Sequence, residues 1–230
     1  MQGKKSIILI LLLLSGAIFL MGLSFFLDAP VRERILQAEG MEWDHSAKRQ
    51  FFNAISRYGD WPELMLLGAL GVGIARQCQS RRWQEIFLTA MVASTLAGAI
   101  TNTLRLTTGR TRPRVSPQSE QAWYGPYHNG EWTIGHAPWN SFPSGHTATA
   151  FGFAIVIFLA SPMWGLLALL IAALIASSRL ILGAHHPSDV VGAIFIASGV
   201  IWLLSNSRIQ RLCIMNSPFL AKRCSSQKRS

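Results

Sequence analysis

Residues 143–160 read PSGHTATAFGFAIVIFLA, a short polar segment followed directly by an apolar run. A serine before such a run is a common helix N-cap, and a glycine lets another group approach the backbone closely. The run is nearly long enough to cross the hydrocarbon core of a bilayer at about 1.5 Å per residue. We therefore predict a membrane-spanning helix whose first turn holds Ser144, Gly145 and His146.

The whole chain has the composition of an integral membrane protein. Of its 230 residues, 50% are hydrophobic and only 14% are charged, and the apolar residues gather into long runs. Long runs, rather than alternation or helical spacing, indicate membrane spans. We predict an all-α bundle of six transmembrane helices, near Ser6–Leu27, Trp61–Ala75, Trp83–Leu104, Gly145–Ala160, Met163–Leu182 and Val190–Ser205.

The first of these spans also has features of a secretory signal peptide, because Lys4 and Lys5 precede its apolar run. That run of about 22 residues is longer than the usual signal core of roughly 7–15. The segment Phe25–Pro30 also lacks a small-residue cleavage site. We expect a membrane anchor, with a cleaved signal peptide as the alternative.

The distribution of charge predicts the orientation. With the N-terminus inside, the inner segments carry one acid, Glu85, and eleven basic residues: Lys4, Lys5, Arg76, Arg81, Arg82, Arg208, Arg211, Lys222, Arg223, Lys228 and Arg229. The positive-inside rule favours this topology, with both termini in the cytoplasm. Because these charges flank membrane spans, they fit an anionic leaflet, and we exclude nucleic acid as a partner.

The segments between the spans predict the domain organisation. Ala29–Asp60 mixes charged and apolar residues, which suggests short amphipathic helices on the extracytoplasmic surface. Leu106–Phe142 is long and rich in Gly, Pro and aromatic residues, which is typical of a functional loop, here one that covers the site. We expect one domain over residues 1–207 and a basic cytoplasmic tail over residues 208–230.

Three polar clusters fall on the same predicted face, the extracytoplasmic one: Arg105 with Arg112 and Pro113, then Pro143–His146, then Ser178, Arg179, His185 and Asp189. Arginines can neutralise a phosphoryl dianion, a Ser-Gly pair at a helix start can offer backbone N–H donors, and two histidines can divide nucleophilic and acid/base work. Taken singly, each residue has an ordinary role, such as snorkelling, helix capping or pairing with the helix dipole. The combination predicts a phosphate site.

These clusters resemble the signature of the type 2 phosphatidic acid phosphatase superfamily, which also includes vanadium haloperoxidases. That signature reads K-x6-RP, PSGH and SR-x5-H-x3-D. The chain has Arg105-LTTGRT-Arg112-Pro113, Pro143-Ser144-Gly145-His146 and Ser178-Arg179-LILGA-His185-HPS-Asp189. Only the first segment departs, because Arg105 stands where the family has lysine. Arginine keeps the charge but is planar and bulkier, so geometry or substrate choice can change.

The resemblance implies a role for each motif residue. Phosphate-binding residues would be Arg105, Arg112, Ser144, Gly145 and Arg179. His185 would attack phosphorus, and His146 would protonate the leaving oxygen and later activate water. Asp189 would accept the Nδ1 proton of His185, which leaves the Nε2 lone pair free. His186 is the rival nucleophile, but only His185 has the family's spacing to Arg179 and Asp189.

A membrane site predicts a phosphorylated lipid as substrate, with no metal or other cofactor, in a bacterial inner membrane. The head group stays open among undecaprenyl diphosphate, phosphatidylglycerol phosphate, phosphatidate and lipid A. Aromatic residues that could line an acyl-chain entrance are Trp123, Tyr124, Tyr127, Trp132 and Trp139.

Three alternatives stay open. They are a non-catalytic lipid-phosphate-binding protein, a vanadate-dependent haloperoxidase, and a divalent-metal hydrolase that uses His128, His136 or Glu131. All six histidines are expected outside, whereas Cys78, Cys213 and Cys224 are expected inside, so we predict no disulfide.

Overall fold

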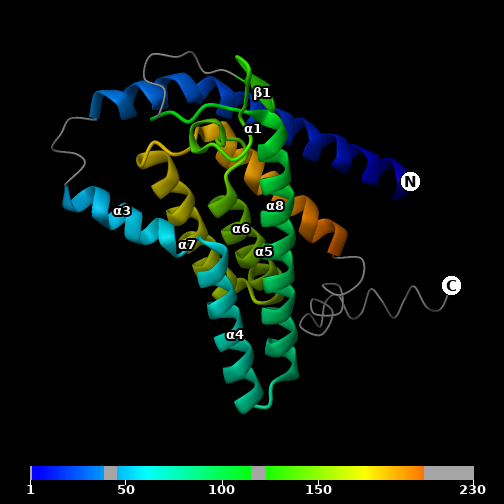
Figure 1. The fold of residues 1–230 in the computed structure, drawn as a ribbon. Coiled ribbons are helices and arrows are strands. Elements are labelled where there is room, and N and C mark those ends of the chain that lie inside the picture. The colour runs from blue at the N-terminus through cyan, green and yellow to red at the C-terminus, as the bar shows by residue number, and fades with distance from the viewer. Residues whose placement is uncertain (1, 39–45, 115–122, 205–230) are drawn as a thin grey trace.

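The computed structural model describes residues 2–38, 46–114 and 123–204, which fold mainly into helices (Figure 1). The α-helices are α1 (Gln2–Ala38), α3 (Ala47–Arg57), α4 (Trp61–Gln77), α5 (Arg81–Thr108), α6 (Gly145–Ala160), α7 (Pro162–Ile181) and α8 (Pro187–Leu204). A two-stranded hairpin of β1 (Tyr127–His128) and β2 (Glu131–Trp132), and a 3-10 turn, η1 (Ala137–Trp139), lie between α5 and α6. The predicted all-α class is confirmed.

Every predicted span has a helix at its place. Among the described residues, four segments are long and apolar enough to cross a membrane: Leu14–Gln37 in α1, and the whole of α5, α7 and α8. Helix α6 is apolar but shorter, and α4 has 17 residues. The structure therefore supports an integral membrane protein with four candidate spans.

Helix α6 forms the centre of the bundle and packs against α5, α7 and α8 (Figure 1). Small residues make this possible, since a Cβ atom at Gly152 would lie 3.1 Å from the Ala93 carbonyl oxygen of α5. Small residues let membrane helices approach backbone to backbone. This close approach brings the middle of α6 against the middle of α5.

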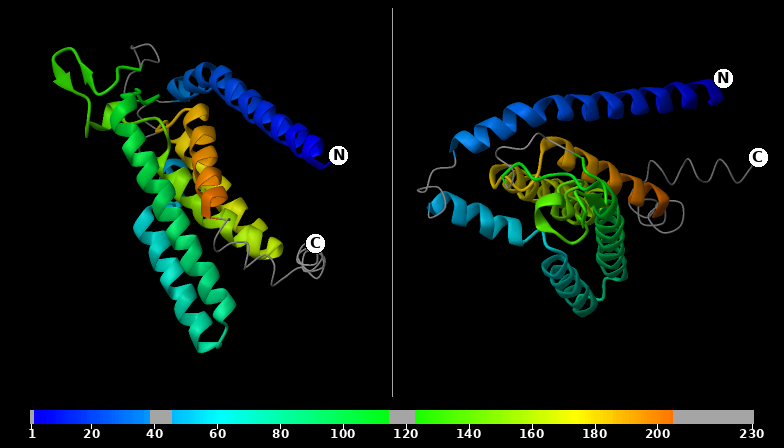
Figure 2. Two further views of the ribbon diagram at one scale, coloured as in Figure 1. Left: turned by 90° about the vertical axis from the view of Figure 1, so that its right-hand side faces the viewer. Right: turned by 45° about the horizontal axis from the view of Figure 1, so that its top comes forward.

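Helix α1 is longer than predicted. The first span was expected to end near Leu27, with separate amphipathic helices after it, but α1 continues through Pro30 to Ala38. Among the described residues that follow α1, α3 is a separate short helix, and it is capped by the Ser46 hydroxyl, which accepts a bond from the Arg49 N–H at 3.2 Å. Asp28 does not end α1, because bundle partners bind its buried carboxylate. Figure 2 shows α1 running past the bundle beside α8, which it contacts.

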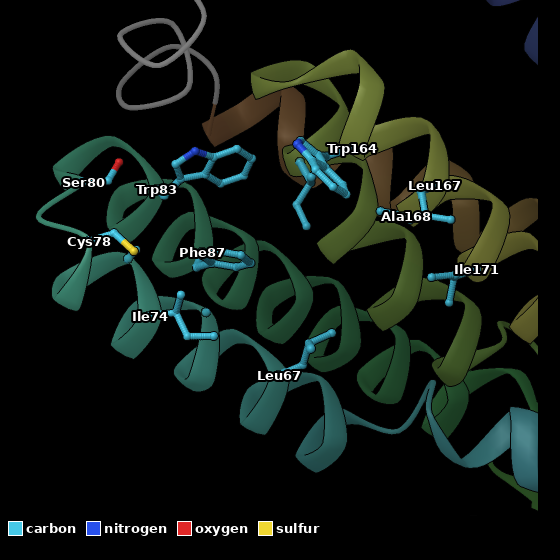
Figure 3. A pocket seen from close by; sticks show the side chains of 13 residues that line it. Leu67, Ile74, Cys78, Ser80, Trp83, Phe87, Trp164, Leu167, Ala168 and Ile171 are labelled. Atoms are coloured by element: carbon cyan, nitrogen blue, oxygen red, sulfur yellow. The ribbon is translucent and has the colours of Figure 1, made fainter.

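Four helix termini meet at one end of the bundle, which we call the motif end: the last turns of α5 and α7 and the first turns of α6 and α8. Arg105, Gly145, Arg179 and Asp189 lie on these turns. The opposite halves of α5, α6 and α7, together with α4, enclose an apolar groove of about 560 Å³ lined by Trp83, Phe87 and Trp164, among others (Figure 3). The motif residues do not line this groove. The predicted tail, residues 208–230, lies outside the described residues.

Candidate active site

Arg105 joins the first motif segment to the second. Its Nε donates to the Pro143 carbonyl oxygen at 3.1 Å, and its Nη1 donates to Asn102 Oδ1 at 3.2 Å. A Cβ atom at Gly145 would lie 3.3 Å from Arg105 Nη1, so a side chain there would press on the guanidinium group. The arginine that replaces the family's lysine is thus held against the start of α6.

The chain reverses direction at Gly109, directly after α5. Gly109 has the left-handed φ of 55°, which glycine adopts without strain. Its carbonyl accepts the Tyr124 N–H at 3.2 Å. The reversal places Arg112 at the motif end, where its N–H donates to the Pro138 carbonyl at 2.9 Å and its Nη2 to the Asn140 carbonyl at 3.4 Å. The loop predicted to cover the site therefore contributes to it.

Arg179 completes a set of three half-buried guanidinium groups. It lies in the last turn of α7 and donates from Nη1 to the hydroxyl of Ser56 in α3. Within the described part of the chain, no carboxylate lies within 4.0 Å of Arg105, Arg112 or Arg179. Burial lowers the pKa of Arg112 from its ordinary value, because desolvation disfavours the charged form. Because no described carboxylate neutralises these three positive charges at close range, together they favour the binding of an anion.

His185 is fully buried behind these arginines. Its Nδ1 lies 2.7 Å from the Ser141 carbonyl oxygen. Because a carbonyl can only accept, Nδ1 carries the proton and Nε2 keeps its lone pair. Burial lowers the pKa of His185 to about 3. Asp189 acts to raise this pKa, whereas Arg179 and Arg105 lower it further. The Nε2 atom is buried without a hydrogen-bond partner in the structure, so the ring is a neutral base with a free lone pair.

Asp189 has different partners from those predicted. Its Oδ2 lies 3.6 Å from His185 Nδ1, beyond hydrogen-bond distance, because the Ser141 carbonyl already takes that proton. Instead, Oδ2 accepts the Ser141 hydroxyl at 2.5 Å and the His186 N–H at 2.7 Å, while Oδ1 binds Arg110. Asp189 thus acts on His185 through Ser141 and through its charge. The structure thus has a 3.6 Å contact between the two groups in place of the predicted direct hydrogen bond.

Arg110, which the sequence left without a role, anchors Asp189. Its side chain is 1% exposed, and Nη2 lies 2.6 Å from Asp28 Oδ2 of α1. Asp28 also accepts the Ser188 N–H at 2.9 Å and the Ser188 hydroxyl at 2.6 Å. The Trp123 ring covers the guanidinium at 4.6 Å, a cation–π contact. No local signal in the sequence pointed to this pair, because Asp28 lies one residue past the predicted end of the first span and Arg110 is 82 residues away.

Ser144 and His146 flank the start of α6. Ser144 occupies the N-cap position, yet its side chain makes no capping bond. Its hydroxyl instead accepts a hydrogen bond from Thr147 Oγ1 at 2.9 Å, and its N–H donates to the Asp189 carbonyl oxygen at 3.1 Å. His146 is half-buried, and its Nε2 lies 2.7 Å from Asp60 Oδ1. Asp60 directly precedes α4, and nothing in the sequence motif pointed to it.

The rival nucleophile, His186, faces another part of the structure. Its Nε2 lies 3.1 Å from the Thr111 carbonyl, and the charges that act on it are Asp189, Arg110 and Asp28. His185 is instead acted on by Arg179 and Arg105 of the anion site. The arrangement favours His185 as the group that meets the anion.

The loop aromatic residues have several different surroundings. Tyr127 and Trp132 are exposed and pack edge to face, with their ring centroids 5.4 Å apart, whereas Trp123 contacts Arg110. Tyr124 stacks near His128 at 3.8 Å, and Trp139 lies 5.9 Å from His136. Over the described ranges, no three His, Cys, Asp or Glu side chains form a group that could hold a metal ion.

Comparison with known proteins connects this arrangement to one family. The model of the PAP2 superfamily matches residues 86–212. A lipid A 1-phosphatase of Rhizobium etli is 31% identical over 98 residues, which are 43% of this chain and 40% of that protein. A candidate undecaprenyl-diphosphatase of Escherichia coli is 33% identical over 111 residues, or 48% of this chain and 52% of that protein. The matched segments thus span about half or less of these relatives.

A crystal structure supports the fold. The transmembrane PAP2-type phosphatidylglycerolphosphate phosphatase of Bacillus subtilis superposes with a TM-score of 0.53 at 19% identity, covering 95% of this chain and 100% of that one. The family model covers more than half of the chain and includes all three motif segments. The chain is therefore a member of the PAP2 superfamily.

Proposed function

We propose that the chain is a membrane lipid phosphatase that works without a metal ion, through a phosphohistidine on His185. The proposal rests on two neighbouring features. Three guanidinium groups have no described carboxylate nearby, and the buried, neutral imidazole of His185 has an Nε2 atom without a hydrogen-bond partner in the structure. A phosphoryl group between them would receive charge compensation from one side and a nucleophile from the other.

The proposed reaction has two steps. Nε2 of His185 attacks phosphorus as the bond to the lipid oxygen breaks, and His146 gives that oxygen a proton. His146 then removes a proton from a water that attacks the phosphohistidine, which releases phosphate and restores His185. Arg105, Arg112 and Arg179, together with Ser144 and the Gly145 N–H, would hold the phosphoryl oxygens in both steps.

The substrate class follows from the setting. The site lies at the end of a bundle of apolar helices, where the head group of a lipid would reach it. The relatives are a lipid A 1-phosphatase, a candidate undecaprenyl-diphosphatase and a phosphatidylglycerolphosphate phosphatase, so each name has a phosphorylated lipid as its substrate. We propose six spans in a bacterial inner membrane, with the motif end on the extracytoplasmic side and the basic segments in the cytoplasm.

The test is phosphate release by the purified protein in detergent from lipid mono- and diphosphates, with a chelator present. We expect chelator-resistant release that falls by at least about a thousandfold in His185→Ala, because the nucleophile is lost. His136→Ala is the matched control, since this loop histidine is exposed and lies outside the motifs. Equal release by His185→Ala would exclude the proposed nucleophile.

The alternatives predict other outcomes in the same assay. Binding of lipid phosphates without turnover would indicate a non-catalytic binding protein. Loss of release on chelation, or in His136→Ala, would favour the metal hydrolase. Halide oxidation by peroxide after vanadate is added would favour a haloperoxidase. Chelator-resistant turnover of lipid phosphates that depends on His185 would exclude both the binding protein and the metal hydrolase.

A further inference from the structure

The end of α3 and the turn that follows it, together residues 56–60, form a wall of the active site that the motifs do not include. The Ser56 hydroxyl accepts a bond from Arg179, and the Gly59 carbonyl accepts one from Thr149 Oγ1 of α6 at 2.7 Å. A Cβ atom at Gly59 would lie 2.3 Å from Ile175 Cγ2 and 3.5 Å from His146 Cβ. The turn is therefore pressed against α6 and α7, and glycine allows that contact.

Asp60, the last residue of this turn, binds His146 rather than its own helix. It occupies the N-cap position of α4, where a carboxylate usually accepts a backbone N–H of the first turn. Its side chain makes no such bond, and Oδ1 lies 2.7 Å from His146 Nε2 instead. A distance of this length is typical of a charge-assisted hydrogen bond. The contact therefore replaces a capping bond that this position could have made.

We propose that Asp60 is the positioning residue of His146: it accepts the Nε2–H, so that Nδ1 is the nitrogen that passes the proton to and from the reacting groups. This inference rests on the proposed function. The Ser141 carbonyl fixes the tautomer of His185 by binding Nδ1–H. Asp60 would fix the tautomer of His146 in the same way, by binding Nε2–H.

Electrostatics gives Asp60 a second effect. Burial disfavours a protonated imidazole at His146, and so do the groups that face it, Arg179, His185, Arg105 and Arg112. Asp60 supplies a negative charge against them. Burial raises the pKa of Asp60, and Glu63 adds to this effect, whereas Arg179 and Arg57 oppose it.

The proton balance of the first step is complete with these groups. The phosphorus–oxygen bond to the lipid breaks, phosphorus bonds to His185 Nε2, and the leaving oxygen takes the Nδ1 proton of His146. Asp60 stays ionised and keeps the Nε2–H bond throughout. In the second step, Nδ1 takes a proton from the attacking water, and the imidazolium is again paired with Asp60.

The test compares Asp60→Asn with the wild type on two substrates. Asparagine keeps the shape and an acceptor oxygen but removes the charge. On a lipid phosphomonoester, whose leaving alkoxide needs a proton, we expect kcat to fall at least about tenfold. On 4-nitrophenyl phosphate, whose leaving group departs without one, the first step, measured as the burst of 4-nitrophenol before steady turnover, should change less than about threefold. The alkaline limb of the lipid pH profile should move to lower pH, because His146 loses its proton more easily.

Glu63→Gln is the matched control. Glu63 is the neighbouring carboxylate, in the first turn of α4, and pairs with Arg57 at 3.6 Å instead of with His146. We expect it to leave the ratio of the two rates unchanged. An equal loss on both substrates in Asp60→Asn, or no loss on either, would overturn the inference. Absence of turnover by the wild type would overturn the proposed function, and this inference with it.

Discussion

His185 has a pKa of about 3 in the folded protein because burial disfavours its charged form. In an unfolded chain its pKa would be about 6.5. Between these values the unfolded state binds one more proton, so stability rises with pH across that window. The contribution of His185 is complete above about pH 6.5 and is lost as pH falls towards 3.

We therefore predict that the free energy of unfolding decreases as the pH is lowered from neutral to about 4.5. His185→Gln should reduce this slope by up to about 1.4 kcal/mol per pH unit, because glutamine does not titrate. Melting temperatures in detergent, measured at stepped pH values for both proteins, provide the test. Parallel curves would show that His185 does not titrate on unfolding.

Arg110 lies between two buried carboxylates, Asp28 and Asp189. We predict that Arg110→Met destabilises the protein by about 3–5 kcal/mol, because both carboxylates lose their cation without access to water. Activity should fall as well, since Asp189 loses a bond that fixes its position. Asp28→Asn, which removes one partner and keeps an acceptor, should have a smaller effect on both.

Arg57→Met is the control for the Arg110 substitution, because Arg57 has 80% of its side chain exposed and pairs with Glu63 only at 3.6 Å. Its effect should stay within about 0.5 kcal/mol. Thermal unfolding in detergent measures both variants. Equal stability of Arg57→Met and Arg110→Met would contradict the buried network.

At the scale of elements, the end of α5 decides where the first motif segment lies. Gly109 has a φ of 55°, and a Cβ atom there would lie 1.9 Å from the Gly125 carbonyl oxygen. We predict that Gly109→Ala lowers the melting temperature by about 5 °C or more, because it combines left-handed strain with a backbone clash. Activity should fall with it, since Arg112 follows this turn.

Gly130→Ala separates the two causes. Gly130 also has a positive φ, of 88°, but a Cβ atom there would meet nothing within 4 Å. This variant should lose only the smaller strain contribution and keep its activity. Melting temperature and phosphate release measure both variants, and an equal effect of the two would show that the clash is relieved elsewhere.

Most helices could be predicted from the sequence because apolar runs mark them. The runs at Trp83–Leu104 and Met163–Leu182 correspond to α5 and α7 with shifts of a few residues. Helix α1 was underestimated, because Asp28 and Pro30 resemble the end of a span when their partners are unknown. A buried carboxylate needs a partner that is 82 residues away in the sequence, Arg110, and no local pattern reports it.

For the whole molecule, the charge distribution predicts that the motif end faces away from the cytoplasm. Cys78 is an exposed free thiol at the opposite end, beside the α4–α5 turn. With Cys213 and Cys224 replaced by serine, we predict that a membrane-impermeant maleimide labels Cys78 only after lysis. A cysteine introduced by Glu131→Cys, in the β1–β2 hairpin, should be labelled in intact cells. The reverse pattern would contradict the proposed orientation.

The site could be predicted only in part. The eight motif residues were recognisable because they share fixed spacings, and the structure places them at one end of the bundle. Asp28, Ser141 and Asp60 were not recognisable, because each is a single polar residue whose role depends on a partner from another helix or loop. Tertiary packing, rather than local sequence, selects such partners.

The hydrogen bond from His185 to the Ser141 carbonyl has a consequence for genetic experiments. Every residue offers the same main-chain carbonyl, so an alanine scan would remove the Ser141 hydroxyl and leave the group that sets the imidazole tautomer untouched. Natural variation of the residue at position 141 would likewise leave the bond from His185 to this carbonyl in place. Chemical editing of the backbone, with an ester in place of the amide that follows Ser141, would weaken the acceptor directly. The orientation of His185 therefore depends on the path of the main chain at Ser141 and not on the Ser141 side chain.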